Sequence, residues 1–183
     1  MDDIVVSTGE IPPYLYNECV HSVETSRNYW CEHPAFSLYG ESEVFLKYNL
    51  PLYDGGDSLT LPPLFESLWL EVSKKVPFNH RLIRAYVNAH KYGDEDNIHR
   101  DEIHIDEGAT IIVYLCHEWR PSWFGPTLFF KEKDTGLEIV YSVLPKPNRF
   151  VVFNKDIPHC VAPISRRFNG VRYTCMFKVE KVV

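Results

Sequence analysis

The second half of this 183-residue chain is dominated by short β-strand patterns, and this feature constrains the fold more than any other. Residues 81–92 alternate in polarity, and β-branched or aromatic runs follow at 109–116, 127–130, 137–143, 149–153, 159–163 and 171–179. Turn sequences containing glycine, proline or asparagine separate several of these runs. Many short strands at regular spacing predict two packed sheets, either a sandwich or a jelly roll.

Residues 1–80 predict helical and irregular support for this core. The clearest helix follows Thr60, a suitable N-cap, because two prolines suit its first turn and its apolar residues share one face. A weaker helical pattern covers residues 14–30. No repeat or low-complexity linker divides the chain. We therefore expect a single domain over residues 1–183: an all-β core at 81–183 with N-terminal helices (α+β), folded as a double-stranded β-helix or jelly roll.

Composition excludes several other classes of protein. The net charge is -6 with acidic and basic residues mixed, so a nucleic-acid partner is not expected. The start lacks the basic and apolar regions of a secretory signal, and no apolar run is long enough to span a bilayer. The five cysteines are scattered and form no Cys-x-x-Cys, which indicates reduced thiols. We expect a cytoplasmic, intracellular protein without a membrane partner.

One acidic segment contains His-x-Asp twice, as His99/Asp101 and His104/Asp106. Residues i and i+2 of a strand point to the same side, so each pair could supply two metal ligands. An open iron site needs two imidazoles and one carboxylate on one face, and His159 would bring the second imidazole from a distant strand. Either pair also fits solvated polar residues in an acidic loop, so both remain open here.

Arg172 adds a candidate anion site on the last predicted strand. A guanidinium group matches a carboxylate with two parallel hydrogen bonds, and an inward-pointing arginine in a β core needs such a partner. Two alternatives stay open: Arg172 could face water on an edge strand, or Arg166 or Arg167 could bind the anion instead.

The order of these elements resembles a known family. Segments 86–102, 109–130, 143–164 and 171–177 are similar, in that order, to the prolyl 4-hydroxylase-like branch of the Fe(II)/2-oxoglutarate-dependent oxygenases. The resemblance covers about Arg84 to Phe177. It departs from the family pattern at Phe124, which precedes Gly125 where two glycines are usual, and at Asn148, where a glycine is common. Both departures fall at turns and bear on the shape of the substrate entrance.

The resemblance implies a role for each matching residue. It implies that His99, Asp101 and His159 bind iron, and the gap before the following strand favours this pair over His104/Asp106, which would lie in a loop or contact substrate. It further implies that Arg172 and Tyr114 bind the distal carboxylate of 2-oxoglutarate, and that Asn88 and Tyr92 line the co-substrate pocket.

The implied activity is hydroxylation with Fe(II), 2-oxoglutarate and O2. The carboxylate of Asp101 favours hydroxylation over halogenation, because a halogenating relative has a small residue there. The implied substrate is a prolyl residue or a proline-like amino acid or other small molecule. Alternatives are a nucleobase-dealkylating oxygenase, against which the acidic balance argues, a non-catalytic jelly-roll binding module, and a cupin-like sandwich with another divalent metal.

Overall fold

The computed structural model describes residues 4–27, 30–32, 47–53, 61–94, 96–101 and 106–182, with the backbone alone at 30–32 and 47–49. The N-terminal elements are β1 (Ile4–Thr8), α1 (Pro13–Thr25), β2 (Trp30–Glu32), β3 (Lys47–Tyr53), α2 (Pro63–Val72) and a 3₁₀ turn (Ser73–Lys75). The others are β4 (His80–His90), β5 (Gly108–Leu115), a 3₁₀ turn (Pro121–Trp123), β6 (Thr127–Lys133), β7 (Gly136–Val143), β8 (Arg149–Asn154), β9 (His159–Val161) and β10 (Arg172–Lys181).

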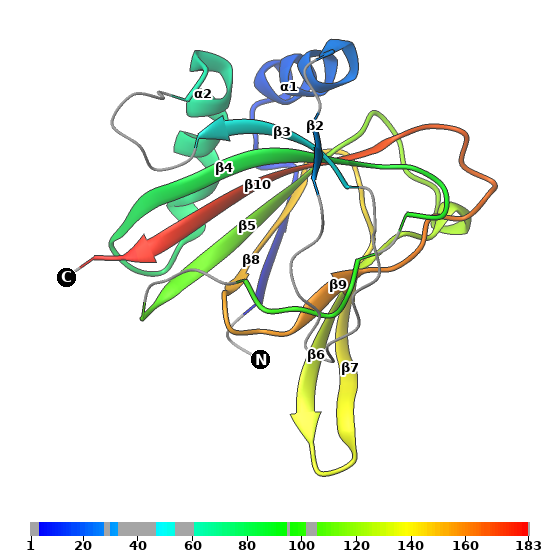
Figure 1. Ribbon diagram of the computed structural model, residues 1–183. Helices are drawn as coiled ribbons and strands as arrows, with labels where there is room; N and C mark the ends of the chain where they lie inside the picture. Colours follow the sequence, from blue (N-terminus) through cyan, green and yellow to red (C-terminus); the bar gives the residue numbers. More distant parts are fainter. Residues whose placement is uncertain are drawn as a thin grey trace.

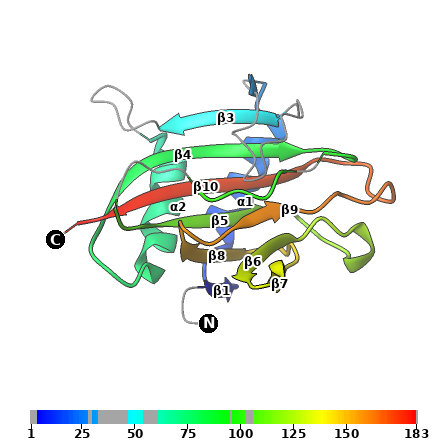
Figure 2. The same cartoon turned by 60° about the horizontal axis from the view of Figure 1, so that its bottom comes forward.

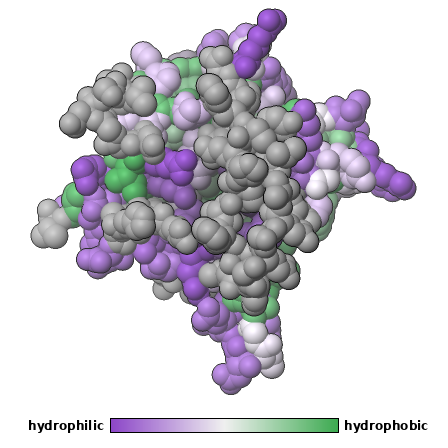
Figure 3. Space-filling view, viewed as in Figure 1, coloured by the Kyte–Doolittle hydropathy of each residue, from purple (hydrophilic) through white to green (hydrophobic). Residues whose placement is uncertain are grey.

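Two antiparallel sheets face each other. The major sheet has the order β1-β8-β5-β10-β4-β3-β2, and Figure 2 shows β8, β5, β10, β4 and β3 side by side. The minor sheet has the order β7-β6-β9. The β6–β7 hairpin projects from the body of the molecule, and its tip is hydrophilic (Figures 1 and 3). This arrangement confirms the predicted jelly roll, and the strand patterns from residue 81 onward predicted β4 to β10 within a few residues.

Alternation along the strands produces two apolar layers. The outward face of the major sheet packs against α1 and α2 (Figure 1), through buried side chains such as Val87, Val113 and Phe177. The inward face meets the minor sheet through a smaller cluster that includes Ile112 and Phe129. Because the helices seal the outward face, the polar side chains of the inward face lie in the space between the sheets.

The N-terminal prediction needs two corrections. Three strands occur in residues 1–80, where helices and irregular chain were predicted, and all three join the major sheet. A boundary at residue 81 therefore does not separate support from core. The predicted cap at Thr60 lies outside the described residues, and the structure caps α2 at Pro62, without a side-chain hydrogen bond. On α2 the fully buried residues are Phe65, Leu68 and Val72, with Leu64 only partly buried.

The two departures from the family pattern share a backbone property. Phe124 has φ 55° and Asn148 has φ 54°, the left-handed region that glycine adopts without strain. Asn148 is stabilised there by its side chain, whose Oδ1 accepts from Ile11 N at 3.0 Å and whose Nδ2 donates to Ile11 O at 2.6 Å. At both turns a residue other than glycine therefore adopts a positive φ.

The described part of the chain contains no helix long and apolar enough to cross a membrane. Cys19, Cys116, Cys160 and Cys175 are free thiols, and all but Cys116 are buried.

Candidate functional site: a metal centre beside a buried arginine

Backbone pairing brings two histidines together across the opening between the sheets. His99 lies in the segment after β4, and His159 begins β9, 60 residues away by their numbers. His99 N donates to His159 O at 3.0 Å and His159 N donates to His99 O at 2.9 Å. This antiparallel bridge sets the two rings 4.5 Å apart between centroids. The position of His99 therefore depends on a strand that follows much later in the sequence.

Both imidazoles have the orientation of metal ligands. The Nδ1 atom of His99 lies 2.8 Å from Asn97 O, and that of His159 lies 3.0 Å from Ile157 O. A carbonyl oxygen only accepts hydrogen bonds, so each Nδ1 carries the proton and each Nε2 keeps its lone pair. The ligand atoms of His99, Asp101 and His159 all lie within 4.8 Å of one another. Two imidazoles and one carboxylate are the set of donors that an open iron site requires.

The carboxylate of Asp101 is buried and hydrogen-bonded on both oxygens. Oδ2 accepts from Thr110 Oγ1 at 2.5 Å, and Oδ1 accepts from Lys178 Nζ at 2.6 Å. Burial opposes ionisation, but the neighbouring His159 and Lys178 outweigh it and hold the pKa of Asp101 below its usual value. Asp101 is therefore a carboxylate at neutral pH, the form that binds a metal.

Burial raises the pKa of a carboxyl group but lowers that of an imidazole, and in His159 it is the dominant influence. It lowers the pKa of His159 to about 4, and the adjacent His99 contributes in the same direction. The ring edge is enclosed by Phe153, with ring centroids 4.7 Å apart. At neutral pH His159 is thus an uncharged imidazole held in one orientation, as a metal ligand must be.

Arg172 is a buried guanidinium with unmet hydrogen-bonding capacity. It is 1% exposed, its Nη2 donates to Thr127 Oγ1 at 3.2 Å, and its Cζ lies 5.4 Å from the centre of the Tyr114 ring. Within the described residues its Nε and Nη1 atoms find no hydrogen-bond partner. Burial lowers the pKa of Arg172, yet an arginine stays charged in proteins. A buried cation with two spare donors fits an anionic ligand, such as a carboxylate.

Tyr114 supports this cation from β5. It is fully buried, and its hydroxyl donates to Thr127 Oγ1 at 2.8 Å. Burial raises the pKa of Tyr114, so the phenol stays protonated and can act as a donor. Thr127 on β6 accepts from both residues, and so fixes the guanidinium relative to the phenol.

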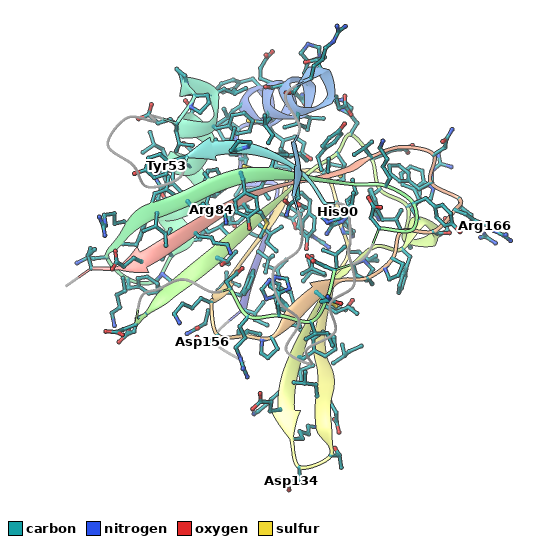
Figure 4. The ribbon with its side chains drawn as sticks, in the orientation of Figure 1. Tyr53, Arg84, His90, Asp134, Asp156 and Arg166 are labelled. Atoms are coloured by element: carbon teal, nitrogen blue, oxygen red, sulfur yellow. The ribbon has the colours of Figure 1, made fainter. Side chains whose placement is uncertain are left out.

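One small cavity joins the histidines to the arginine. Its lining includes His99, His159, Arg172 and Thr127. Asn88 also lines it, as expected from the alternation of β4, on which Figure 4 marks Arg84 and His90 towards opposite ends. Tyr86, Asp96, Ile112, Val161, Thr174 and Met176 complete the wall. The site residues of β4 and β10 lie side by side on one face of the major sheet, where Thr174 pairs with Asn88.

Tyr92 is not part of this cavity, contrary to the prediction. Its side chain is 61% exposed, and it lies in a turn beyond the end of β4. The alternation that was used to place it stops at His90, where the strand ends, so the inference extended two residues too far.

The rival candidates lie elsewhere or outside the described residues. Asp106 is exposed, and His104 lies outside the described residues. Arg166 and Arg167 are exposed on the loop before β10, where Figure 4 marks Arg166 far from the sheets' interior. Of the two histidine–aspartate pairs, only His99/Asp101 is described next to His159.

Three contributing residues were missed in the sequence. Thr127 lies in segment 109–130, which carried part of the resemblance, yet no role was assigned to it. Nothing in the sequence indicated that Thr110 and Lys178 contact Asp101, because a threonine or a lysine in a predicted strand does not reveal which carboxylate lies opposite. Trp119 and Trp123 pack with each other and with Phe168 rather than entering the cavity.

A comparison with protein-family profiles decides the family. The profile described as the 2OG-Fe(II) oxygenase superfamily matches residues 87–177, a range that includes His99, Asp101 and His159. The chain belongs to the 2OG-Fe(II) oxygenase superfamily. A search of curated protein sequences found no match to the chain.

Solved oxygenase structures share the fold across nearly the whole chain. A prolyl hydroxylase from Trichoplax adhaerens, in complex with a hypoxia inducible factor peptide fragment, has a TM-score of 0.70 at 14% identity, covering 99% of this chain and 84% of its own. A viral collagen prolyl hydroxylase from Paramecium Bursaria Chlorella virus-1, in its 2OG complex, has a TM-score of 0.63 at 13% identity, covering 98% and 96%. HygX from Streptomyces hygroscopicus, with nickel and 2-oxoglutarate bound, has a TM-score of 0.63 at 13% identity, covering 98% and 83%.

As a member of this superfamily the chain is a 2-oxoglutarate-dependent dioxygenase that uses Fe(II), 2-oxoglutarate and O2. Its own residues fit these groups. The two Nε2 lone pairs and one ionised carboxylate fit the metal, and the spare donors of the buried Arg172 fit a dicarboxylate.

Proposed function

We propose that the whole chain forms one oxygenase domain that hydroxylates an unactivated C–H bond in a prolyl residue or a proline-like small molecule. In this proposal His99, Asp101 and His159 bind Fe(II). Arg172 binds the distal carboxylate of 2-oxoglutarate, Tyr114 supports it, and Asn88 lines the same pocket.

The observation that carries the proposal is the pairing of the metal-ligand cluster with an unsatisfied guanidinium along one cavity. The cluster alone would fit many divalent metals, and a buried arginine alone could be structural. Together they match a co-substrate that chelates a metal with one end and carries a carboxylate at the other. A cupin-like site for metal alone gives no reason for Arg172 to be buried with spare donors.

Each protein group has a separate task in this scheme. The carbonyls of Asn97 and Ile157 fix the tautomer of the two histidines, so that both lone pairs face the metal. Thr127 orients Arg172, and the burial of the cavity keeps water from competing for the guanidinium. When bound, iron and 2-oxoglutarate supply the oxidising chemistry, in which 2-oxoglutarate becomes succinate and CO2.

The choice of hydroxylation rests on the carboxylate of Asp101. A small residue there would leave a coordination position free for halide, and an aspartate occupies that position. The choice of a prolyl or proline-like substrate rests on the prolyl hydroxylases among the solved structures that share the fold over almost all of this chain.

An anaerobic titration with Fe(II) and 2-oxoglutarate tests the site. The wild type is expected to develop the weak visible absorption band of the chelated complex, and His99→Ala is expected to lose it. Asp106→Ala, in the other His-x-Asp pair, is the matched control and should keep the band. A wild type without the band, or a band that survives in His99→Ala, would refute the assignment.

The substrate requires a separate measurement. Succinate formation is compared with no added substrate, with free L-proline and with proline-containing peptides, and products are examined by mass spectrometry for a gain of one oxygen. Coupled turnover with either proline source supports the proposal. Turnover that proline never stimulates, in a protein that shows the absorption band, argues for another substrate.

A further inference from the structure

A buried lysine reaches the carboxylate of the metal site from the far end of the same strand that carries Arg172. Lys178 Nζ lies 2.6 Å from Asp101 Oδ1, and the residue is 9% exposed. Lys178 lies opposite Arg84 of β4, marked in Figure 4, and opposite Thr110 of β5. Residues 172 and 178 point to the same side of β10, because side chains alternate along a strand.

The two oxygens of Asp101 have different surroundings. Oδ2 accepts from Thr110 and lies 3.8 Å from His159 Nε2, so it is the oxygen on the imidazole side. Oδ1 is held by the ammonium group of Lys178. Carboxylates bind divalent cations through either one oxygen or both, and a neighbouring cation on one oxygen favours the first mode.

We propose that Lys178 is a positioning residue that makes Asp101 a one-oxygen ligand, through Oδ2, by holding Oδ1 in an ion pair. This inference rests on the proposed function of the triad. In an octahedral site, two imidazoles and one oxygen leave three positions open, whereas a two-oxygen carboxylate leaves two. A chelating co-substrate fills two positions, so the Lys178–Asp101 pair preserves the position that O2 needs.

Charge considerations exclude a role for Lys178 in strengthening metal binding. A lysine beside a divalent-cation site repels the metal, so Lys178 weakens binding if it has any direct effect. A buried ion pair is also weak evidence for a contribution to stability, because apolar residues of similar volume often replace such pairs without loss. The remaining role for Lys178 is to hold Asp101 Oδ1 in a hydrogen-bonded ion pair, so that this oxygen does not bind the metal.

Water-proton relaxation of the Mn(II)-loaded protein tests the proposal, because it reports the number of waters on the metal. Mn(II) on the wild type should carry three waters. In Lys178→Met the freed Oδ1 should bind the metal, which lowers the relaxation enhancement at saturation by about one third. The same variant should bind Mn(II) more tightly, by about tenfold, because a cation is removed and a ligand atom is added.

Two further variants complete the experiment. Lys178→Arg keeps a cationic donor and should retain the wild-type relaxation value. Lys181→Met is the matched control, since Lys181 lies on the same strand and pairs with Glu107 on the surface. Should Lys178→Met fail to fold, the shorter apolar Lys178→Leu is judged by the same criterion.

An unchanged relaxation enhancement in the folded apolar variant overturns the inference, even if its thermal stability falls. A wild type that binds no Mn(II) would refute the proposed triad itself. The two failures are thus distinguishable in one set of titrations.

Discussion

Because the guanidinium of Arg172 is not fully hydrogen-bonded, we expect that replacing Arg172 with methionine stabilises the ligand-free protein. Two of its nitrogen atoms are buried with no hydrogen-bond partner among the described residues. A buried donor left unpaired destabilises a fold by about 1–3 kcal/mol. Methionine in its place removes both donors while filling most of the volume.

The opposing losses are smaller. Arg172→Met gives up one hydrogen bond to Thr127, worth about 1 kcal/mol, and the contact with the Tyr114 ring, worth about 1 kcal/mol. The net expectation is a gain of about 2 kcal/mol in the free energy of unfolding of the ligand-free protein. For a chain of this size that raises the melting temperature by roughly 4–8 °C.

The same variant should bind 2-oxoglutarate far more weakly. Removing one partner of a buried ion pair loses about 3–5 kcal/mol, which corresponds to a dissociation constant raised by roughly 100-fold to several thousand-fold. Saturating 2-oxoglutarate with Mn(II) should therefore raise the melting temperature of the wild type strongly and that of Arg172→Met hardly at all.

Thermal denaturation with and without these ligands is the assay. Arg149→Met is the matched control, because Arg149 donates to Thr8 Oγ1 and to Leu144 O, so its loss should destabilise the protein. A ligand-free Arg172→Met that melts below the wild type would refute the view that Arg172 is held in an unsatisfied state for an anion.

Three other predictions concern the same site and its supports. Thr127→Val leaves the donors of Tyr114 and Arg172 without their shared acceptor, so we expect the dissociation constant for 2-oxoglutarate to rise about tenfold by calorimetry. Because burial lowers the pKa of His159 to about 4 from 6.5, only the unfolded chain takes up a proton there between these pH values. The stability of the metal-free protein should then fall by up to about 3 kcal/mol as the pH decreases through that window, and by less in His159→Gln; equal losses in chemical denaturation would contradict this. Asn148→Ala should destabilise by about 2–3 kcal/mol, since it loses two hydrogen bonds and strains a positive φ, whereas Asn148→Gly keeps the φ and should lie between it and the wild type. An alanine variant as stable as the glycine variant would show that the backbone conformation contributes nothing.

The local patterns of the sequence were sufficient for most of the β core. Side-chain alternation and turn residues predicted β4 to β10, because both properties depend on neighbours a few residues apart. The His99/Asp101 pair was interpreted with strand geometry, but the structure places both residues in the segment after β4, where His99 forms an isolated bridge with His159. Tyr92 was misplaced for the same kind of reason: alternation places side chains only as far as the strand continues, and nothing in the local sequence marked its end at His90.

The N-terminal strands were not predicted because they are stabilised by the strands with which they pair, more than by their own composition. β1 pairs with β8 and β3 with β4, so their hydrogen bonds depend on residues far along the chain. β3 also contains Pro51, and a proline within a segment argues against predicting a strand there from the sequence alone. Such segments become strands only when a sheet edge is available to them.

The sequence by itself determined which groups are available for the chemistry: two imidazoles, a carboxylate and an arginine. The tertiary structure alone decided what surrounds them. Lys178 meets Asp101 across 77 residues, and Thr127 meets Arg172 across 45. These contacts follow from the register of paired strands, and register is a property of the assembled sheet that no single segment of sequence contains.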